Sequence, residues 1–415
     1  MEELLQKGRL AREASYYLSS LNTRTKNNIL NKAAENLISE RKIILEANEE
    51  DMKSAKDEGL KGAILDRLLM NEERIRAMSH GLMAISLLED PVGEIVMMKR
   101  RPNGLLVGQQ RVPIGVIGII YESRPNVTAD VFGLCLKTGN AAILRGGKEA
   151  FRTNKAITVV MQSTLYSMKI PQGTLQLVEN TSRESAVAMM KLNQFIDLLI
   201  PRGGAGLIKA VVQNSTVPVI ETGVGNCHIY IDEYADPDKA ISITVNAKTQ
   251  RPGVCNAAET VLIHEKAAEK ILRPLADELK KKGVEIRGDQ RVRNMIPEAV
   301  KLTDEDWSTE YLDLIIAAGI VNSPDDAINH INHYGSGHSE CIVTENYTHA
   351  QEFLARVDAA AVYVNASTRF TDGYEFGFGA EIGISTQKLH ARGPMGLREL
   401  TTTKYIIYGN GQIRV

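Results

Sequence analysis

From residue 115 to residue 220, short apolar segments alternate with helical stretches, and this alternation restricts the fold more than any other feature. It indicates βαβ units and a mostly parallel sheet. Each apolar segment ends in a loop rich in Gly, Arg or Asn, and doubly wound sheets bind ligands at that end of their strands. The sequence therefore predicts an α/β fold with ligand contacts in these loops. The predicted strands are Gly115–Tyr121, Ala141–Arg145, Thr174–Val178, Phe195–Ile200 and Val217–Glu221, and the helices between them include Thr128–Leu136, Asn154–Met168 and Ser182–Lys191.

The segments before residue 115 and after residue 220 have different residue patterns. Residues 2–90 read as amphipathic helices, because apolar positions recur at intervals of three and four among charged ones. Residues 94–98 and 105–112 read as strands around Asn103-Gly104, a strong hairpin signal. Beyond Asp232 the α/β pattern restarts. We predict a helix over 237–247, a loop over 250–257, a strand over 260–264, a helix over 266–282 and a late strand at 405–408.

Length and composition narrow the class of protein. A chain of 415 residues is too long for one compact core, so two principal domains are expected. The net charge of −2 gives no case for nucleic acid or an anionic membrane surface, and no apolar run reaches the roughly 20 residues of a spanning helix. The amino terminus lacks a signal-peptide core, and the four cysteines form no CxxC pair. A cytoplasmic enzyme fits these features best.

Cys255 is the predicted nucleophile. Pro252 and Gly253 impose a tight turn before it, and small residues after it leave space for a ligand. Backbone N–H groups at such a turn lower the pKa of a thiol and later bind an oxyanion. A cysteine is more often simply buried, and Cys135, among apolar neighbours, fits that interpretation.

Two glycine-rich turns are candidate phosphate contacts. The run 202–206 (RGGAG) follows a predicted strand and opens a helix at 207–212, so Gly203, Gly204 and Gly206 let a phosphate approach the helix N-terminus. The spacing is not GxGxxG, and a bare strand-to-helix turn explains it equally well. Arg145 and Lys148 flank paired glycines and would bind a ribose 2′-phosphate, or else are charges on a solvated turn.

The segment 122–126 (ESRPN) places a polar cluster at another strand end. Asn126 would donate to an oxyanion, and Arg124 would hold a phosphate or carboxylate. A capped helix start is the simpler alternative. The histidines at 330, 333 and 338 lack the carboxylate of an HExxH site, so no metal is predicted.

Together these pieces resemble the aldehyde dehydrogenase superfamily. The strand at 113–121, the run 138–144 (TGNAAIL) and the run 221–226 (ETGVGN) match its motifs in order. Glu221 sits where the superfamily carries its E-L-G-G glutamate, and Cys255 follows it by 34 residues, the expected separation. Segments 321–342, 365–373 and 390–397 are similar to its glutamate-5-semialdehyde dehydrogenase branch. Positions shared with that branch include Ala327, His330, Ile331, His338, Ser339 and Glu340.

The resemblance implies an aldehyde-dehydrogenase-like fold with a Rossmann-type cofactor lobe, an α/β catalytic lobe and a β-hairpin oligomerisation arm. The implied bounds are 1–92 and 113–229 for the cofactor domain, 230–375 for the catalytic domain, 93–112 and 400–415 for the arm and its strand, and 376–399 for a return segment to the cofactor domain. It also implies a homodimer or homotetramer, and it makes glutamate 5-kinase a partner to test.

The implied reaction is the NADPH-dependent reduction of L-glutamyl 5-phosphate to L-glutamate 5-semialdehyde with release of phosphate, the second step of proline biosynthesis. It would proceed through a Cys255 thioester, with Asn126 as oxyanion donor and Glu221 orienting the thiol or cofactor. The cofactor contacts would be Arg145, Lys148, Gly203, Gly204, Gly206 and Glu310, the last being nearest to the superfamily's E-x-F-G-P ribose contact. Arg124 and Arg369 would bind the substrate. A hydrolytic or CoA-acylating aldehyde dehydrogenase, or a non-catalytic protein of this fold, is the alternative.

Overall fold

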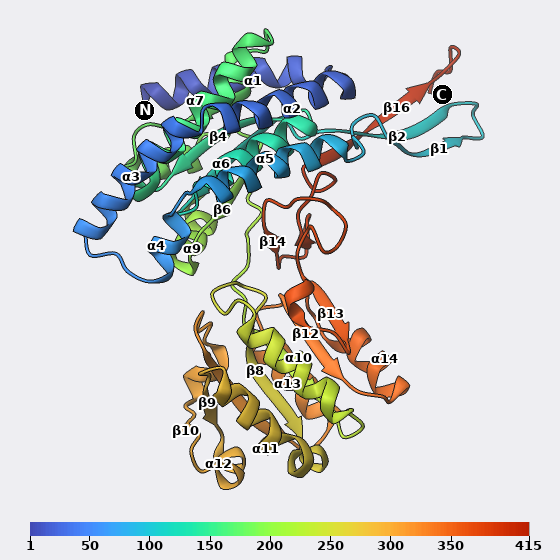
Figure 1. The fold of residues 1–415 in the computed structure, drawn as a ribbon. Coiled ribbons are helices and arrows are strands. Elements are labelled where there is room, and N and C mark those ends of the chain that lie inside the picture. The colour runs from blue at the N-terminus through green and yellow to red at the C-terminus, as the bar shows by residue number, and fades with distance from the viewer. Residues whose placement is uncertain (415) are drawn as a thin grey trace. The chain divides into compact units, whose positions relative to one another are not determined.

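The computed structural model describes residues 1–414, and of Ala63 only the backbone. The chain forms two compact units. Unit 1 comprises Met1–Glu221, Gly377–Gly383 and Met395–Val415, and unit 2 comprises Thr222–Phe376 and Ile384–Pro394. Each unit has its own parallel sheet covered by helices (Figure 1). No helix among residues 1–414 is long and apolar enough to cross a membrane.

Unit 1 is built on a four-stranded parallel sheet in the order β5-β4-β3-β6. All residues of the two central strands are buried, as expected for a sheet with helices on both faces. The chain adds β4 and β5 on one side of β3 and β6 on the other, so the strand order reverses between β3 and β6, where such sheets bind ligands. The strands are β3 (Val116–Tyr121), β4 (Ala141–Gly146), β5 (Leu175–Leu177) and β6 (Leu198–Arg202).

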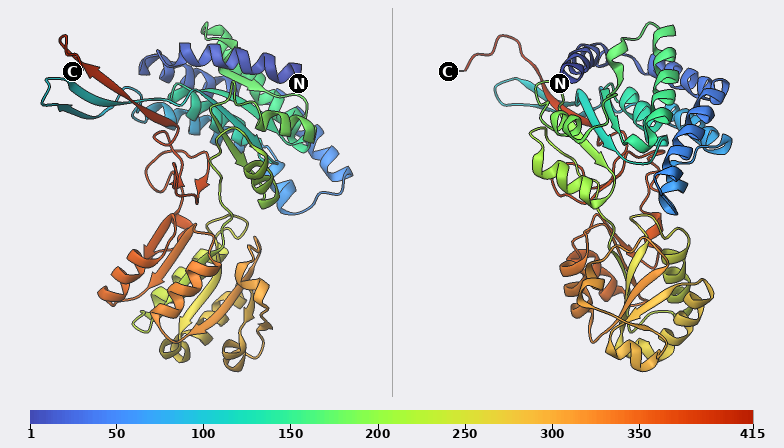
Figure 2. Two further views of the ribbon diagram at one scale, coloured as in Figure 1. Left: turned by 180° about the vertical axis from the view of Figure 1, so that it is seen from behind. Right: turned by 90° about the vertical axis from the view of Figure 1, so that its left-hand side faces the viewer.

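Helices of two origins cover this sheet (Figure 2). The amino-terminal ones, predicted from the periodicity of residues 2–90, are α1 (Glu2–Leu18), α2 (Thr23–Ser39), α3 (Arg41–Asp57), α4 (Ala63–Leu68) and α5 (Glu72–Leu87). Asn22 and Asn71 cap α2 and α5 by accepting backbone hydrogen bonds. The helices between strands are α6 (Asn126–Lys137), α7 (Phe151–Ser167), α8 (Arg183–Met190) and α9 (Ala205–Asn214), with short 3-10 turns η1 (Lys148–Ala150) and η2 (Gln172–Thr174).

Two of the predicted strands of unit 1 need correction. The segment predicted as Phe195–Ile200 starts later, because residues 192–196 form a turn in which the Ile196 N–H donates to the Leu192 carbonyl. The segment Val217–Glu221 is not a strand: it makes only an isolated bridge between Leu199 and Val219. Pro218 lies in this segment and has no N–H to donate, which limits any ladder with a neighbour.

A three-stranded antiparallel sheet in the order β1-β2-β16 forms the arm of unit 1. The predicted hairpin turn is confirmed, with Gly104 in the left-handed region (φ 88°) and Arg101 N–H donating to Leu105. The carboxyl-terminal strand pairs with β2 of the same chain along its whole length. The strands are β1 (Ile95–Arg100), β2 (Leu106–Pro113) and β16 (Thr401–Tyr408). Exposed apolar side chains on the arm are Ile95, Val96, Met97, Met98, Tyr405, Ile407 and Tyr408.

Unit 2 has a seven-stranded parallel sheet in the order β10-β9-β11-β8-β7-β12-β13. Its strands are β7 (Cys227–Ile231), β8 (Ala258–His264), β9 (Glu285–Gly288), β10 (Val300–Lys301), β11 (Ile315–Val321), β12 (Ser339–Val343) and β13 (Ala361–Val364). Its helices are α10 (Pro237–Thr249), α11 (Glu265–Lys281), α12 (Gln290–Met295), α13 (Pro324–Tyr334) and α14 (Tyr347–Arg356), with η3 (Asp304–Ser308) and η4 (Thr368–Phe370). A two-stranded sheet pairs β14 (Ile384–Ser385) with β15 (Gly393–Pro394).

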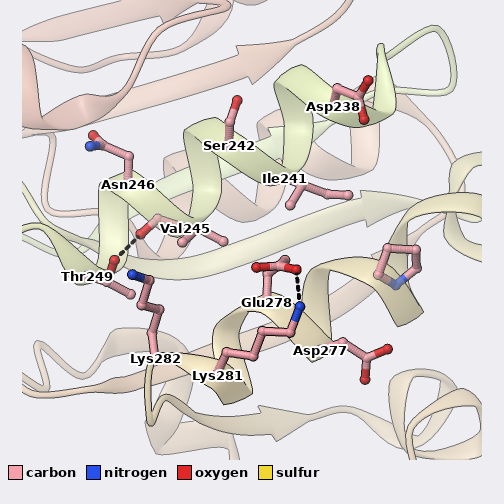
Figure 3. A pocket seen from close by; sticks show the side chains of 11 residues that line it. Asp238, Ile241, Ser242, Val245, Asn246, Thr249, Asp277, Glu278, Lys281 and Lys282 are labelled. Atoms are coloured by element: carbon pink, nitrogen blue, oxygen red, sulfur yellow. Dashed lines mark hydrogen bonds and ion pairs between the residues drawn. The ribbon is translucent and has the colours of Figure 1, made fainter.

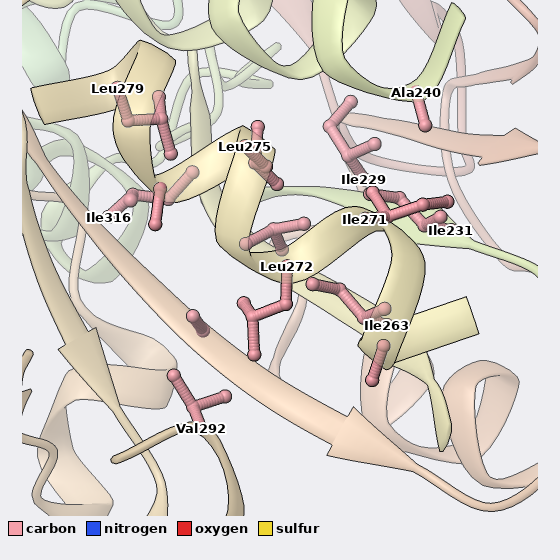
Figure 4. Close-up of a cluster of buried hydrophobic side chains, with 14 of the residues drawn as sticks. Ile229, Ile231, Ala240, Ile263, Ile271, Leu272, Leu275, Leu279, Val292 and Ile316 are labelled. Atoms are coloured by element: carbon pink, nitrogen blue, oxygen red, sulfur yellow. The ribbon is translucent and has the colours of Figure 1, made fainter. Parts of the chain in front are cut away.

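The helices of unit 2 divide its core between the two faces of the sheet. α10 and α11 lie side by side (Figure 3). α11 buries one face against the strands, and Leu272, Leu275 and Leu279 on this face are spaced three and four residues apart (Figure 4). α13 and α14 pack on a second cluster that includes Tyr230. Strand β8 is buried along its whole length, so the loop that leads into it ends at a rigid element.

Candidate active site

The loop between α10 and β8 carries Cys255 in unit 2. The N–H of Ala257 donates to the carbonyl of Val254 at 3.1 Å, which closes a turn around the cysteine. Cys255 is half-buried, whereas the other three cysteines are buried. Burial raises the pKa of Cys135 to about 12 and has the same effect on Cys341. Cys255 is therefore the thiol best placed to react.

The carbonyl of Cys255 lies against the segment that precedes β7. A Cβ atom at Gly225 would stand 1.5 Å from this carbonyl oxygen, so only glycine fits there. The thiol of Cys227 donates to the same oxygen at 3.2 Å. Residues 225–227 thus hold the backbone of the candidate nucleophile from one side.

Residues 368–371 hold the loop from the other side. The side-chain amide of Asn256 donates to the carbonyl of Thr371 at 2.9 Å, and the hydroxyl of Thr368 donates to the carbonyl of Asn256 at 2.7 Å. Arg369 donates through Nε to Gln250 at 2.9 Å and through a second nitrogen to the Asn256 amide oxygen. The predicted substrate-binding Arg369 therefore lies within the loop's own hydrogen-bond network.

Two arginines bring positive charge to this loop. Burial and then the cation of Arg251 lower the pKa of Arg369, while Cys255 acts on it in the opposite direction. Arg251 is exposed and Arg369 is half-buried. An anionic group arriving at Cys255 would therefore meet two cations, at least one of them in solvent.

A buried ion pair lies at the root of the loop. Lys248 Nζ, in the last turn of α10, is 2.5 Å from Glu259 Oε2 in β8, and neither side chain is exposed. Burial raises the pKa of Glu259 to about 7 despite the attraction of Lys248. The other carboxylate oxygen accepts the N–H of Leu312 at 3.3 Å. This pair joins the helix before the loop to the strand after it.

In unit 1, the loops that follow β3 and β6 meet through a carboxylate. Glu122 Oε2 accepts the N–H of Gly204 at 3.0 Å, at the N-terminus of α9. A Cβ atom at Gly203 would lie 2.4 Å from the same oxygen, whereas one at Gly206 would meet nothing within 4 Å. This end of α9 therefore already binds an anionic group, and its glycines leave room around it.

Other residues of the 122–126 turn are also held by hydrogen bonds. Ser123 has φ 44° and gives both its N–H and its hydroxyl to Glu149 Oε1, each at 2.8 Å. Asn126 is exposed at the start of α6, and its amide donates to Asp130 Oδ2 at 2.9 Å. Burial raises the pKa of Asp130 to about 6. Arg124 is half-buried in the same turn.

The two predicted 2′-phosphate ligands differ in environment. Arg145 is buried and donates to the carbonyls of Thr181 and Ser182, at 2.5 and 2.9 Å. Lys148 is exposed and pairs with Glu58 at 2.9 Å. The contacts of Arg145 favour a role in holding the loop after β5, and those of Lys148 leave its ammonium group at the surface.

Of the two remaining predicted residues, one lies at a boundary between the units in sequence and the other lies within unit 2. Glu221 is half-buried at the last position of that segment of unit 1. Glu310, predicted as a ribose contact, accepts the N–H of Gly225 at 2.8 Å within unit 2. Glu310 therefore supports the backbone beside Cys255.

A groove in unit 2 lies away from these residues. This groove of about 790 Å³ runs between α10 and α11, and none of the predicted site residues lines it (Figure 3). Its charged side chains pair locally, as in Lys281 with Glu278 at 2.6 Å. Within residues 1–414 no group of three His, Cys, Asp or Glu side chains is arranged to hold a metal ion.

Comparisons with known proteins agree with this arrangement. The model of the "Aldehyde dehydrogenase family" matches residues 8–296. A "Gamma-glutamyl phosphate reductase" of Clostridium botulinum is 60% identical over 414 residues, which covers 100% of both chains. One from Moorella thermoacetica is 61% identical over 412 residues, 99% of each chain.

The chain belongs to the aldehyde dehydrogenase family. Within this family it falls in the gamma-glutamyl phosphate reductase branch, as its full-length relatives do. The crystal structure of a gamma-glutamyl phosphate reductase from Thermotoga maritima is 52% identical, covers 100% of both chains and superposes with a TM-score of 0.97. The predicted aldehyde-dehydrogenase-like fold is confirmed.

Sequence reasoning missed several groups around the candidate nucleophile. Asn226, Cys227, Lys248 and Glu259 were not predicted as site residues, although Cys227 contacts the loop, Lys248 and Glu259 join the elements that carry it, and Asn226 precedes Cys227. One signal was available: Glu259 is a lone charge at the start of an otherwise apolar strand, where a buried partner is required.

Proposed function

We propose that this chain reduces L-glutamyl 5-phosphate to L-glutamate 5-semialdehyde, releasing phosphate, with NADPH as the reductant, as the second step of proline biosynthesis. The observation that carries the proposal is the half-buried Cys255 in a loop that contains Arg251 and is hydrogen-bonded to Arg369. A thiol beside two cations suits an acyl phosphate, because the cations favour both the thiolate and the anionic substrate. The names of the full-length relatives support the same substrate.

Cys255 would attack the acyl carbon as a thiolate and expel phosphate, leaving a thioester. The N–H of Cys255 and the amide of Asn126 are the proposed oxyanion donors, and removing one such donor typically costs about 3–4 kcal/mol. Arg369 and Arg124 are proposed to bind the phosphate and the α-carboxylate. Glu221 is not required to activate water, because hydrolysis of the thioester would discard the substrate.

The residues of unit 1 fit a dinucleotide phosphate. At the N-terminus of α9 the N–H of Gly204 donates to the carboxylate of Glu122, so a phosphate is expected to bind there in its place. Gly203, Gly204 and Gly206 would line this contact, and Lys148 would reach a 2′-phosphate. NADPH, when bound, supplies the hydride that reduces the thioester.

Assembly and location are part of the proposal. The arm presents apolar side chains on β1 and β16, which supports a homodimer or homotetramer formed through this sheet. Glutamate 5-kinase remains a proposed partner. None of the four cysteines is in a disulfide, which agrees with the reducing cytoplasm.

One assay tests the reaction. NADP⁺ reduction is followed with L-glutamate 5-semialdehyde in the presence and absence of inorganic phosphate. Turnover that requires phosphate supports an acyl-phosphate reductase. Turnover that needs only water, or coenzyme A in place of phosphate, would replace the proposal with one of its rivals.

A further inference from the structure

The motif at residues 321–342 has no part in the chemistry proposed above, yet its carboxyl-terminal end lies against the backbone that supports Cys255. We infer that Asn226 is a positioning residue. The motif fixes Asn226 by hydrogen bonds, and the segment 225–228 in turn fixes the carbonyl of Cys255. The inference rests on the proposed role of Cys255 as nucleophile. It assigns the motif to the placement of the thiol.

Asn226 is only 2% exposed and ties together two separate segments of unit 2. Its backbone N–H donates to Ser336 Oγ at 2.9 Å. Its side-chain amide donates to the carbonyls of Trp307, in η3, and Tyr334, at the end of α13, each at 2.8 Å. Both of these carbonyls would be left without that donor if the amide were removed.

The residues beside Asn226 are held in the same way. The N–H of Gly225 donates to Glu310 Oε1 at 2.8 Å, and the N–H of His228 donates to Glu340 Oε2 at 2.7 Å. The register between β7 and β8 shifts between Cys227 and His228, so the regular ladder is interrupted at this point. Side-chain acceptors, rather than strand pairing alone, therefore set the position of the segment.

His330 packs the two segments that accept hydrogen bonds from Asn226. Its ring centroid is 4.6 Å from that of Trp307 and also 4.6 Å from that of Tyr334. Burial lowers the pKa of His330 to about 3, so the ring is neutral near pH 7 and packs as an aromatic group. This explains why the motif contains a half-buried histidine without a metal role.

The position of this segment sets the position of Cys255. The Cys255 carbonyl is in contact with Gly225 and accepts the thiol of Cys227. A shift of residues 225–227 must therefore move the cysteine as well. A misplacement of about 1 Å at a reacting group can reduce the rate about a hundredfold.

The test compares two buried asparagines. In Asn226→Ala, kcat should fall about ten- to a hundredfold while the KM for NADPH changes less than about twofold. The rate at which iodoacetamide alkylates Cys255, followed as a function of pH without substrate, should change about tenfold, since the other three cysteines are buried. Ser336→Ala should give a smaller change in the same direction, and Ser336→Thr, which keeps the hydroxyl, should restore the wild-type values.

Asn48→Ala is the matched control. Asn48 is also 2% exposed, and its side chain bonds to Leu68 and Met70 in unit 1, so its loss should lower the melting temperature without changing kcat or the alkylation rate. Wild-type kcat and alkylation in folded Asn226→Ala and Ser336→Ala would overturn the inference. An equal loss of kcat in Asn48→Ala would do the same, because it would show a general effect of lost stability. Turnover by Cys255→Ala would instead overturn the proposed function.

Discussion

In unit 2, the loop around Cys255 is held by buried groups, whereas in unit 1 the loops that follow β3 and β4 rely on carboxylates at or near the surface. Asn256, Cys227 and the Lys248–Glu259 pair are all buried. By contrast, Glu122 is exposed, and the Lys148–Glu58 pair has exposed fractions of 68% and 53%. Buried polar contacts fix one geometry, while exposed ion pairs contribute about 1 kcal/mol or less and exchange partners readily. A covalent nucleophile needs the first kind of support, and a cofactor that binds and leaves suits the second.

The sharpest test of this contrast removes the proposed nucleophile. Cys255→Ala should reduce turnover to less than about a hundredth of wild type, because covalent catalysis has no substitute, while NADPH binding stays intact. Steady-state NADPH oxidation and a fluorescence titration of NADPH measure the two properties. Cys135→Ser, at a buried site, should lower stability and leave turnover unchanged. Residual activity above that level would remove Cys255 from the mechanism.

The buried pair provides the next test. Lys248→Met leaves the Glu259 carboxylate buried without its cation, which should lower the free energy of unfolding by about 3–5 kcal/mol. Lys239→Met is the control: Lys239 pairs with Glu345 at a similar distance, but both side chains are about half exposed, so the loss of stability should be much smaller. Urea denaturation measures both. Equal losses would mean that burial does not distinguish the two pairs.

The loop that follows β4 in unit 1 is tested through cofactor selectivity. The Arg145→Ala, Lys148→Ala double variant should lose about tenfold or more of its preference for NADPH over NADH, since a charge-assisted bond contributes about 1.5–3 kcal/mol. Lys148→Ala alone should change selectivity without changing stability, whereas Arg145→Ala should also destabilise the loop after β5. Lys155→Ala, which removes an exposed ion pair on α7, is the control. Unchanged selectivity in the double variant would exclude both cations as 2′-phosphate ligands.

The smallest expected effect concerns Asp130. Burial raises its pKa from 3.8 to about 6. Between these two pH values the native state binds more protons than the unfolded state, so the free energy of unfolding falls as pH rises through that window. Asp130→Asn should remove this loss and be more stable at pH 7 by about 1–2 kcal/mol. The upper limit for a shift of about two pKa units is about 3 kcal/mol, since each unit corresponds to about 1.4 kcal/mol. Unfolding free energies measured against pH, as the difference between variant and wild type, provide the test. A constant difference across the acid range would contradict it.

Much of the fold follows from local patterns in the sequence. The helices of residues 2–90, the hairpin at Asn103-Gly104 and the βαβ alternation were all predictable, because each depends on periodicity or turn residues. The segment 217–221 misled the prediction, since an apolar run does not reveal whether its backbone finds a partner strand. Its only ladder contact is with Leu199.

The sequence predicted the candidate nucleophile but not the residues that position it. Cys255 stood out because of Pro252 and Gly253, which act locally. The contacts of Asn226 with residues 307, 334 and 336 span about a hundred positions, and no local pattern encodes such pairings. The same holds for Arg145, whose sequence context resembles a solvated turn although its side chain is buried.

The pairing of β16 with β2 has a consequence for synthesis of the chain. Thr401 pairs with Pro113 and Tyr408 with Leu106, so the edge of β2 stays uncovered until residues 401–408 have left the ribosome. Throughout that interval the nascent chain displays an apolar ribbon with an open edge, a surface on which chains aggregate. Loss of the chain from residue 401 onward would make that transient state permanent. A truncated product should therefore depend on chaperones far more than its small deletion suggests.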